Sequence, residues 1–277
     1  MTLSPAPLWN PSRAAGLQQI EGFSASMGRH YAAERNSDLG PGQRDNTSLL
    51  SPYLRRRMVL ESEVVATAIE QHGYEAAEKF LQEVFWRTYF KGWLERRPSV
   101  WTRYCDDLAA EQIRFNGNET LEAALSGTTG IACFDAWARE LIETSYLHNH
   151  ARMWFASIWI FTLRLPWVLG ADFFMRHLLD GDPASNTLSW RWVAGLHTRG
   201  KHYVATPQNI AKFTDQRFIP SDTELALNPA PLIVAFDYGP ALPTRAITPF
   251  DPSKPSALLI TLGTARQKHL VLSLIHI

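Results

Sequence analysis

The segment DGDPASNTLSWRW, Asp180 to Trp192, places two aspartates, an asparagine and two tryptophans close together in the chain. Burying an aspartate costs free energy unless its charge is paired, whereas tryptophan offers a large flat apolar surface. The mixture predicts a site where negative charge and aromatic rings meet. The alternative for Asp180 and Asp182 is a purely local role as turn and cap residues, because Asp182-Pro183 is typical of a helix start.

The composition indicates a globular chain with an unusual supply of tryptophan. Its 277 residues, 45% of them hydrophobic, suffice for one large domain or for one domain and part of another. The ten tryptophans exceed the about three or four of ordinary usage, which indicates either a tryptophan-rich core or an aromatic lining for a flat ligand. Basic and acidic residues balance at 27 each, so net charge does not indicate a nucleic-acid binder. Local basic groups such as Arg55–Arg57 could still contact phosphates.

The cysteine content and the chain ends bear on location. Cys105 and Cys133 are too few for a metal site or a disulfide framework, so we expect no metal and reduced intracellular thiols. The first residues lack the features of a signal peptide. The longest apolar run, Met153 to Leu163, is short for a membrane span. We therefore expect a cytoplasmic protein with no membrane partner.

Helical spacing of apolar residues dominates the middle of the chain. Ser51-Pro52 predicts a helix start, with that helix ending at Gly73 and a second one spanning Tyr74 to Glu95. Further helices are expected over residues 133–143, 148–165 and 171–179, after Asp182-Pro183, and from Thr206-Pro207. The sequence thus predicts a mainly α fold.

Changes in composition divide the chain into three parts. Residues 1–25 are rich in Pro and Ser and are predicted to be an N-terminal arm, and residues 26–218 a helical domain. Residues 219–277 are expected to be an irregular, Pro-rich extension with β-rich runs at 232–236 and 257–261. Because the chain stops at LVLSLIHI without a cap or polar tail, we expect this extension to be the start of a truncated second domain.

Three blocks of sequence together resemble a known family. They are the segment 180–192, YLHNHARMW at 146–154 and FLQEVFWRTYFKGW at 80–93. Their residues and order are similar to the FAD-binding helical domain of the photolyase/cryptochrome family, over residues 30–215. The family's N-terminal α/β antenna domain has no counterpart here. The resemblance implies that fold and FAD as cofactor.

The resemblance also implies a set of cofactor contacts. The run TSLLS lies at a predicted helix N-terminus, where free N–H groups and the helix dipole favour a phosphate, although simple capping would also explain it. Arg152 is expected to pair with Asp180 beside the flavin, which would compensate two buried charges. Asn186 matches the position near flavin N5, where photolyases carry Asn. The implied contacts are Tyr31, Thr47, Ser48, Leu49, Leu50, Ser51, Arg87, Asn149, Arg152, Asp180, Asp182 and Asn186.

A second set of residues matches the family's substrate cavity. Enzymes of this kind flip damaged bases out of DNA into a pocket, which needs aromatic walls and a few polar groups. The implied substrate contacts are Glu83, Trp86, Asn149, Met153 and Trp192. Glu83 and Trp86 share one helix face, as do Asn149 and Met153. Glu83 would hydrogen-bond a cyclobutane pyrimidine dimer and stabilise its radical anion. For each of these residues taken alone, core packing or a surface pair is the better explanation, whereas the set as a whole is hard to explain as core.

Two tryptophans match the family's electron-hopping chain. Trp190 takes the proximal place and Trp167 the middle one, while Arg114 stands where the distal tryptophan is usual. Trp101, Trp154 and Trp159 are the candidates to replace it, and the alternative is that photoreduction of the flavin is poor. The residues expected to take part in catalysis are therefore Glu83, Trp167, Asn186 and Trp190.

The expected function is light-driven repair of pyrimidine dimers in UV-damaged DNA by a monomeric photolyase-like carbon–carbon lyase. Electron transfer from excited, reduced FAD to the flipped-out dimer would drive it. The first alternative is a cryptochrome-like photoreceptor without repair activity. The others are a flavin-binding structural or redox protein that has lost repair, and a partial gene product that does not fold stably.

Overall fold

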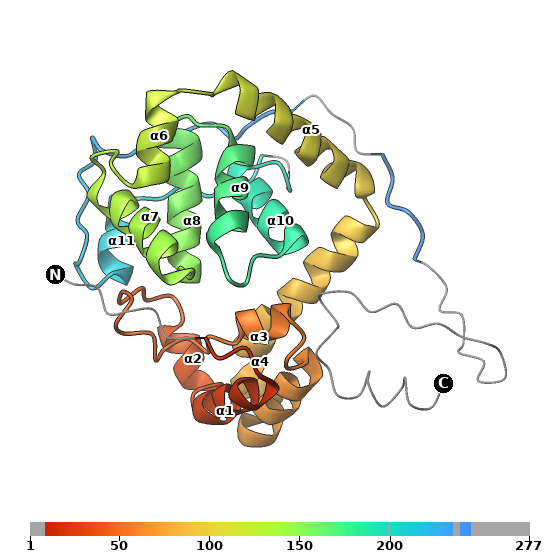
Figure 1. Cartoon of the computed structure of the whole chain (residues 1–277). Coiled ribbons are helices and arrows are strands. Elements are labelled where there is room, and N and C mark those ends of the chain that lie inside the picture. Colours follow the sequence, from red (N-terminus) through yellow and green to blue (C-terminus); the bar gives the residue numbers. More distant parts are fainter. Residues whose placement is uncertain (1–8, 199, 235–238, 245–277) are drawn as a thin grey trace.

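The computed structural model describes residues 9–198, 200–234 and 239–244, and this part of the chain is built from helices (Figure 1). In chain order they are α1 (Arg13–Ser24), α2 (Arg29–Glu34), α3 (Ser51–Arg55), α4 (Glu61–Glu95), α5 (Pro98–Arg114), α6 (Glu119–Ser126), α7 (Ala132–Thr144), α8 (Asn149–Ser157), the π-helix η1 (Ile158–Thr162), α9 (Trp167–His177), α10 (Pro183–Ala194) and α11 (Pro207–Phe213). The mainly α fold class is thereby confirmed. No helix in the described ranges has the length and apolar character to cross a membrane.

Local cap chemistry fixes the helices that carry the predicted site. Asp182 caps α10, since its Oδ1 accepts the N–H of Ser185 at 3.0 Å and Pro183 occupies the first turn. Thr206 caps α11 in the same way through the N–H of Asn209, at 3.2 Å. Both starts agree with the sequence prediction, because they depend only on neighbouring residues.

The helix predicted from Ser51 to Gly73 is wrong in its middle. Helix α3 ends at Arg55, Arg57 adopts a positive φ of 55°, and α4 begins at Glu61. The side chain of Glu63 accepts the N–H of Leu60 at 2.8 Å, which caps the new start. At Gly73 (φ 72°, ψ 163°) the backbone leaves the helical region, so α4 consists of two helical segments joined at a kink; this agrees with the predicted break at Gly73 and with the predicted end at Glu95.

Other helix boundaries also differ from those predicted. The expected helix 148–165 consists of α8 followed by η1, and α9 begins at Trp167 rather than Ala171. Helices α5 and α6 were not predicted. Within the expected N-terminal arm, residues 13–24 form α1, because Ile20 and Phe23 lie on one face and are buried against α4 and its neighbours. The three-part domain division itself stays a prediction.

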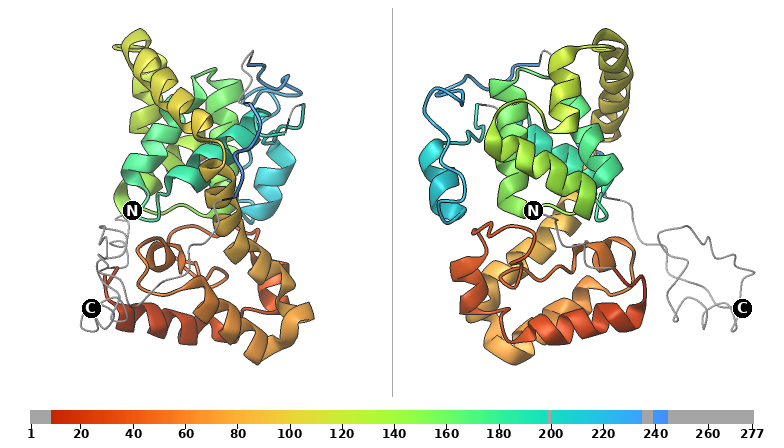
Figure 2. Two further views of the ribbon diagram at one scale, coloured as in Figure 1. Left: turned by 90° about the vertical axis from the view of Figure 1, so that its right-hand side faces the viewer. Right: turned by 60° about the vertical axis from the view of Figure 1, so that its left-hand side comes forward.

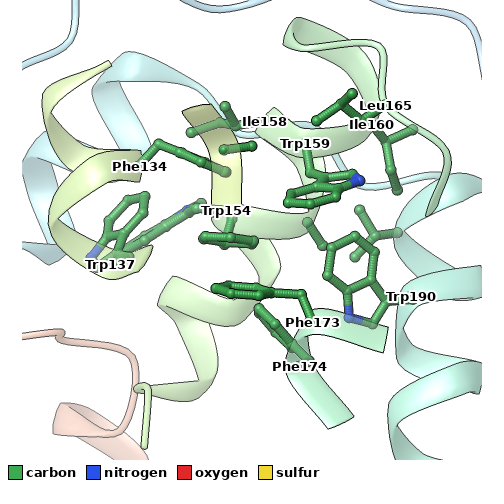
Figure 3. Packing of buried hydrophobic residues seen from close by; sticks show 14 of the residues in the cluster. Phe134, Trp137, Trp154, Ile158, Trp159, Ile160, Leu165, Phe173, Phe174 and Trp190 are labelled. Atoms are coloured by element: carbon green, nitrogen blue, oxygen red, sulfur yellow. The ribbon is translucent and has the colours of Figure 1, made fainter. Parts of the chain in front are cut away.

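Two large hydrophobic clusters organise the described part of the molecule, and a small third one joins α4, α5 and α10. The smaller of the two large clusters joins α1, α3 and the N-terminal part of α4, and Met27, Val59 and Ala68 in it are fully buried. The larger joins α7 to α10 around fully buried Trp154 and Trp159 (Figure 3). Helix α4 runs from the first group of helices to the second (Figure 2) and packs against α10. Tryptophan therefore serves largely as core, as one reading of the composition predicted.

The C-terminal extension lacks the expected β-structure where it is described. Residues 232–234 of the first β-rich run form no strand, and the rest of that run and the second run, 257–261, lie outside the described residues. The N–H of Leu232 instead donates to the carbonyl of Ala194 at 2.9 Å, and that of Leu242 to Arg96 at 2.8 Å. Proline on either side, such as Pro231, supplies no N–H for a ladder, which disfavours a strand here.

Candidate functional site

The carboxylate of Asp182 faces three cations where α10 meets α4. Its Oδ2 lies 3.6 Å from Arg55 Nε, 3.7 Å from Arg87 Nη2 and 3.8 Å from Lys91 Nζ. Only 6% of the Asp182 side chain is exposed. Burial lowers the pKa of Arg87 and of Lys91, and the Asp182 charge opposes this effect on both. Asp182 is therefore a helix cap that is also the centre of a buried charge cluster.

Asp180 forms the ion pair that was predicted for it. Arg152 donates from Nη2 to Asp180 Oδ2 at 3.0 Å and from Nε to the Leu147 carbonyl at 2.8 Å. Burial alone would raise the pKa of Asp180, but the charge and hydrogen bond of Arg152 outweigh it, and the pKa is lowered. Asp180 is thus held as a carboxylate inside the protein.

A small cavity lies between the loop before α3, the middle of α4 and the start of α8. Its volume is about 100 Å³. The lining residues are Tyr31, Arg35, Thr47, Ser48, Leu49, Leu50, Ser51, Glu83, Tyr146, His148 and Asn149. The structure thereby brings together the predicted run 47–51, Tyr31, Asn149 and Glu83. Ligand pockets usually measure roughly 300–1,000 Å³, so this cavity accounts for only part of a dinucleotide.

The run 47–51 owes little to a helix dipole, contrary to expectation. Helix α3 has 5 residues, which is too short for a large macrodipole. Instead the run turns sharply, with Leu49 at φ 51° and Ser48 Oγ accepting the N–H of Leu50 at 3.4 Å. What it presents to the cavity is hydroxyl and backbone groups.

The predicted substrate residues fall into two groups. Glu83 and Asn149 line the cavity, and Glu83 Oε1 accepts from Arg35 Nη1 at 2.8 Å. Burial raises the pKa of Glu83 and Arg35 opposes the shift. Trp86 and Trp192 are 49% and 37% exposed.

Each exposed tryptophan has an aromatic neighbour, while Met153 is half-buried. Trp86 stacks on Phe90 with centroids 5.7 Å apart, and Trp192 on Tyr203 at 5.7 Å. These rings are therefore held in place without being covered.

The two tryptophans of the expected electron chain have different surroundings. Trp190 is buried and packs edge-on against Trp159, at 6.1 Å between centroids, and against Phe174 at 5.0 Å (Figure 3). Trp167 packs against Tyr104 at 5.6 Å, and Tyr104 against Trp101 at 5.2 Å.

Arg114 and Asn186, the remaining two predicted positions, each have a hydrogen-bonding partner. Arg114 is 65% exposed and pairs with Glu111. Asn186 is buried, and its Nδ2 donates to the Ala171 carbonyl at 2.8 Å, which fixes the direction of its amide.

The sequence did not predict five further residues of this site, which are Arg35, Arg55, Lys91, Tyr146 and His148. Tyr146 and His148 stood inside one of the family-like blocks, and Arg55 inside a basic group, so the sequence contained a signal for them. Lys91 stood inside another of these blocks, at 80–93, whereas Arg35 carried no signal, because it meets the Glu83 carboxylate only in the folded chain.

Comparisons with known proteins agree with this geometry. Residues 80–219 match the family model described as the FAD binding domain of DNA photolyase. The chain is 38% identical over 155 residues to a deoxyribodipyrimidine photo-lyase of Streptomyces griseus, covering 56% of this chain and 33% of that protein. It is 34% identical over 197 residues to one of Thermus thermophilus, covering 69% and 44%.

The chain belongs to the family of FAD-binding domains of DNA photolyase. Its fold matches a class III photolyase from Agrobacterium tumefaciens with a TM-score of 0.63 at 26% identity, over 75% of this chain and 44% of that one. A Synechocystis cryptochrome shares the fold, with a TM-score of 0.61 at 24% identity, over 76% and 45%. The chain thus spans less than half the length of these relatives.

The residues present fit FAD, the cofactor of this family. Buried Nε and Nη2 of Arg87 have no hydrogen-bond partner among the described residues, as expected of donors that await a ligand. Hydroxyls of the run 47–51 suit the phosphates, and the carboxylates of Asp180 and Asp182 suit a ring and ribityl chain with N–H and O–H donors. The predicted contact residues other than Asn186 line the cavity or belong to the two carboxylate clusters, and Asn186 lies on α10, where its amide contacts α9.

Proposed function

We propose that this chain is the FAD-bearing part of a photolyase that repairs cyclobutane pyrimidine dimers in DNA with light. The proposal rests on two sets of residues on neighbouring elements, one suited to bind a flavin and one suited to bind the substrate. The buried Arg87–Asp182 and Arg152–Asp180 pairs suit a flavin, and Glu83 on the same helix as Arg87 faces the adjoining cavity. The names of the curated relatives support the same activity.

The chain's contribution to the cofactor is binding and orientation. Thr47, Ser48 and Ser51 would hold the phosphates, and Asp180 would hold the flavin ring with Arg152 keeping it charged. When bound in its reduced form, FAD supplies on absorbing light the electron that splits the dimer and takes it back afterwards. Asn186, a neutral amide fixed by the Ala171 carbonyl, would lie next to the ring without adding negative charge.

The substrate side rests on Glu83 and the exposed aromatic rings. Trp86 and Trp192 offer uncovered faces on which splayed bases can stack. Glu83 would hydrogen-bond the dimer; burial raises its pKa, and the Arg35 charge opposes the shift. Asn149 and Met153 would complete the wall from α8.

The aromatic series from Trp167 to Trp101 favours one replacement for the distal tryptophan. Tyr104 packs against both rings, and Trp101 is partly exposed. Trp154 and Trp159, the other candidates, are fully buried. We therefore place Trp101 at the outer end of the route that re-reduces the cofactor through Trp190.

One observation favours the photoreceptor alternative. Arg35 already pairs with the Glu83 carboxylate, so Glu83 reaches a dimer only if that pair loosens. A chain in which the pair persists would bind FAD and respond to light without repair.

Photorepair by matched variants separates the two functions. FAD-reconstituted, reduced protein is mixed with an oligonucleotide that carries one thymine dimer, and loss of the dimer is measured under blue light. Glu83→Gln is compared with Gln82→Ala, an exposed neighbour. The proposal expects repair by the parent chain and Gln82→Ala, and about a tenfold or greater loss in Glu83→Gln. Flavin binding without any repair would leave the photoreceptor.

A further inference from the structure

A buried ion pair fastens the loop between α2 and α3 to the larger helical group. Arg44 Nη2 donates to Glu140 Oε1 of α7 at 2.6 Å, and the two side chains are 7% and 5% exposed. The same Nη2 lies 3.4 Å from Thr144 Oγ1, and the guanidinium lies over the Tyr146 ring at 4.6 Å. The side chain of Arg44 is therefore held by three residues of α7 and the turn that follows it.

The main chain of the same residue holds Thr47. The carbonyl of Arg44 accepts the N–H of Thr47 at 3.2 Å and its hydroxyl at 3.1 Å. Thr47 is the first residue of the run that lines the cavity, and Tyr146 lines it as well. Arg44 thus connects an anchor on α7 to the position and rotamer of a cavity hydroxyl.

We propose that Arg44 and Glu140 are positioning residues for the cofactor, which hold the run 47–51 in its binding geometry without touching the ligand. The inference rests on the proposed FAD site and names residues outside the cavity lining. Glu140→Gln would leave the buried Arg44 cation uncompensated, and Arg44→Lys would keep the charge but lose the planar guanidinium that reaches Glu140 and Thr144 and lies over Tyr146. In either variant we expect the loop to leave its place. Gln19 Nε2 also donates to the Ser48 carbonyl at 3.0 Å and Leu50 is buried, but neither contact holds the Thr47 hydroxyl, which bonds the Arg44 carbonyl.

The anchor has a defined electrostatic setting. Burial, followed by the charge of Asp38, raises the pKa of Glu140 to about 7, while Arg44 and Arg217 lower it. Asp38 is itself paired with Arg217 at 2.6 Å and accepts from Trp137 Nε1 at 3.0 Å, which fixes the start of the same loop. At pH 8, above this pKa, Glu140 is ionised, so experiments at that pH examine the charged Arg44–Glu140 pair.

The test is a double-mutant cycle on FAD affinity. Dissociation constants are measured for the parent chain, Arg44→Lys, Glu140→Gln, Thr47→Ala and the double variant Arg44→Lys/Thr47→Ala. Glu63→Gln is the control, because it breaks the Arg13–Glu63 ion pair between α1 and α4, away from the loop. Melting of each apo-protein and hydrogen exchange of the Thr47 amide report on folding and on the loop separately.

The proposal expects Arg44→Lys and Glu140→Gln to weaken FAD binding about tenfold and to speed exchange at Thr47, with Glu63→Gln changing neither. The double variant should bind FAD only slightly more weakly than whichever single variant, Arg44→Lys or Thr47→Ala, has the lower FAD affinity. The reason is that both changes remove the same contact of the Thr47 hydroxyl. Unchanged FAD affinity in Arg44→Lys, or fully additive losses, would overturn the proposal while leaving the proposed function intact. A parent chain that binds no FAD would overturn both.

Discussion

Asp182 is the residue on which the site's electrostatics depend. One buried carboxylate compensates Arg55, Arg87 and Lys91 and also caps α10. In the proposed function this cluster needs no acid–base pair, because the cofactor carries the chemistry and the protein would hold charge and shape around it.

Replacing Asp182 with Asn should destabilise the chain far more than an exposed counterpart. The change leaves buried cations uncompensated, so we expect a loss of about 3–5 kcal/mol in the free energy of unfolding. Asp172→Asn, which breaks the pair with more exposed Arg176 on α9, should cost about 0.5 kcal/mol. Urea unfolding of both variants measures the difference, and equal losses would show that the cluster is not buried as described.

The buried imidazole of His148 should make the stability of the chain depend on pH. Burial lowers its pKa from 6.5 to about 4, so the folded chain holds it neutral while the unfolded chain protonates it below pH 6.5. Its contribution is therefore fully present above pH 6.5 and is lost as the pH falls towards 4.

The replacement His148→Asn keeps a cap for α8 but does not titrate. The free energy of unfolding of the parent chain should fall by up to about 3 kcal/mol relative to this variant between pH 6.5 and 4. Parallel pH curves for the two proteins would refute the assignment.

At the scale of elements, the close approach of α9 to α10 fixes the place of Trp190. A Cβ added at Gly170 would lie 2.2 Å from Trp190 Cη2 and 2.9 Å from Trp159 Cε2. Gly170→Ala should therefore destabilise the chain by about 1–3 kcal/mol through overpacking and change the fluorescence of the buried tryptophans. Gly92→Ala is the matched control, because nothing lies within 4 Å of that position on α4. Equal melting temperatures for the two variants would contradict the packing.

Helices α5 and α9 supply the rings that we assign to re-reduction of the cofactor, Trp101 on α5 and Trp167 on α9. Trp101→Phe and Trp167→Phe should each slow light-driven reduction of bound FAD by an external thiol by about tenfold, as the route depends on both rings. Trp93→Phe replaces a partly buried tryptophan on α4 outside this series and should leave the rate near that of the parent chain. The rate is followed by flavin absorbance without oxygen, and normal reduction in Trp101→Phe would exclude it as the outer end.

Helix starts that depend on neighbouring residues could be predicted from the sequence. Helices and ion pairs that depend on residues distant in the sequence could not. The starts of α10 and α11 follow from Asp182-Pro183 and Thr206-Pro207. Helix α1 was missed because its weak pattern has meaning only once Ile20 and Phe23 meet α4. Arg35 and Lys91 escaped notice for the same reason: their partners, Glu83 and Asp182, come from other elements.

At the scale of the whole molecule, α4 links the loop-bearing group of helices to the tryptophan-rich group (Figure 1). The cavity is lined by residues from both groups. Membership in the family sets FAD as the cofactor, while repair and the expected monomeric state stay proposals for the complete protein. Size-exclusion chromatography with light scattering measures that state, and a mass near 31.3 kDa is expected for this chain.

Light-dependent repair tests the central claim most directly. The reduced, FAD-loaded chain is given one oligonucleotide with a cyclobutane thymine dimer and a second with a 6-4 photoproduct, each in blue light and in darkness, and intact thymines are counted by chromatography. The account predicts restoration of the cyclobutane dimer in light alone, with no change in the 6-4 lesion. FAD-loaded protein that restores neither lesion in light would contradict it.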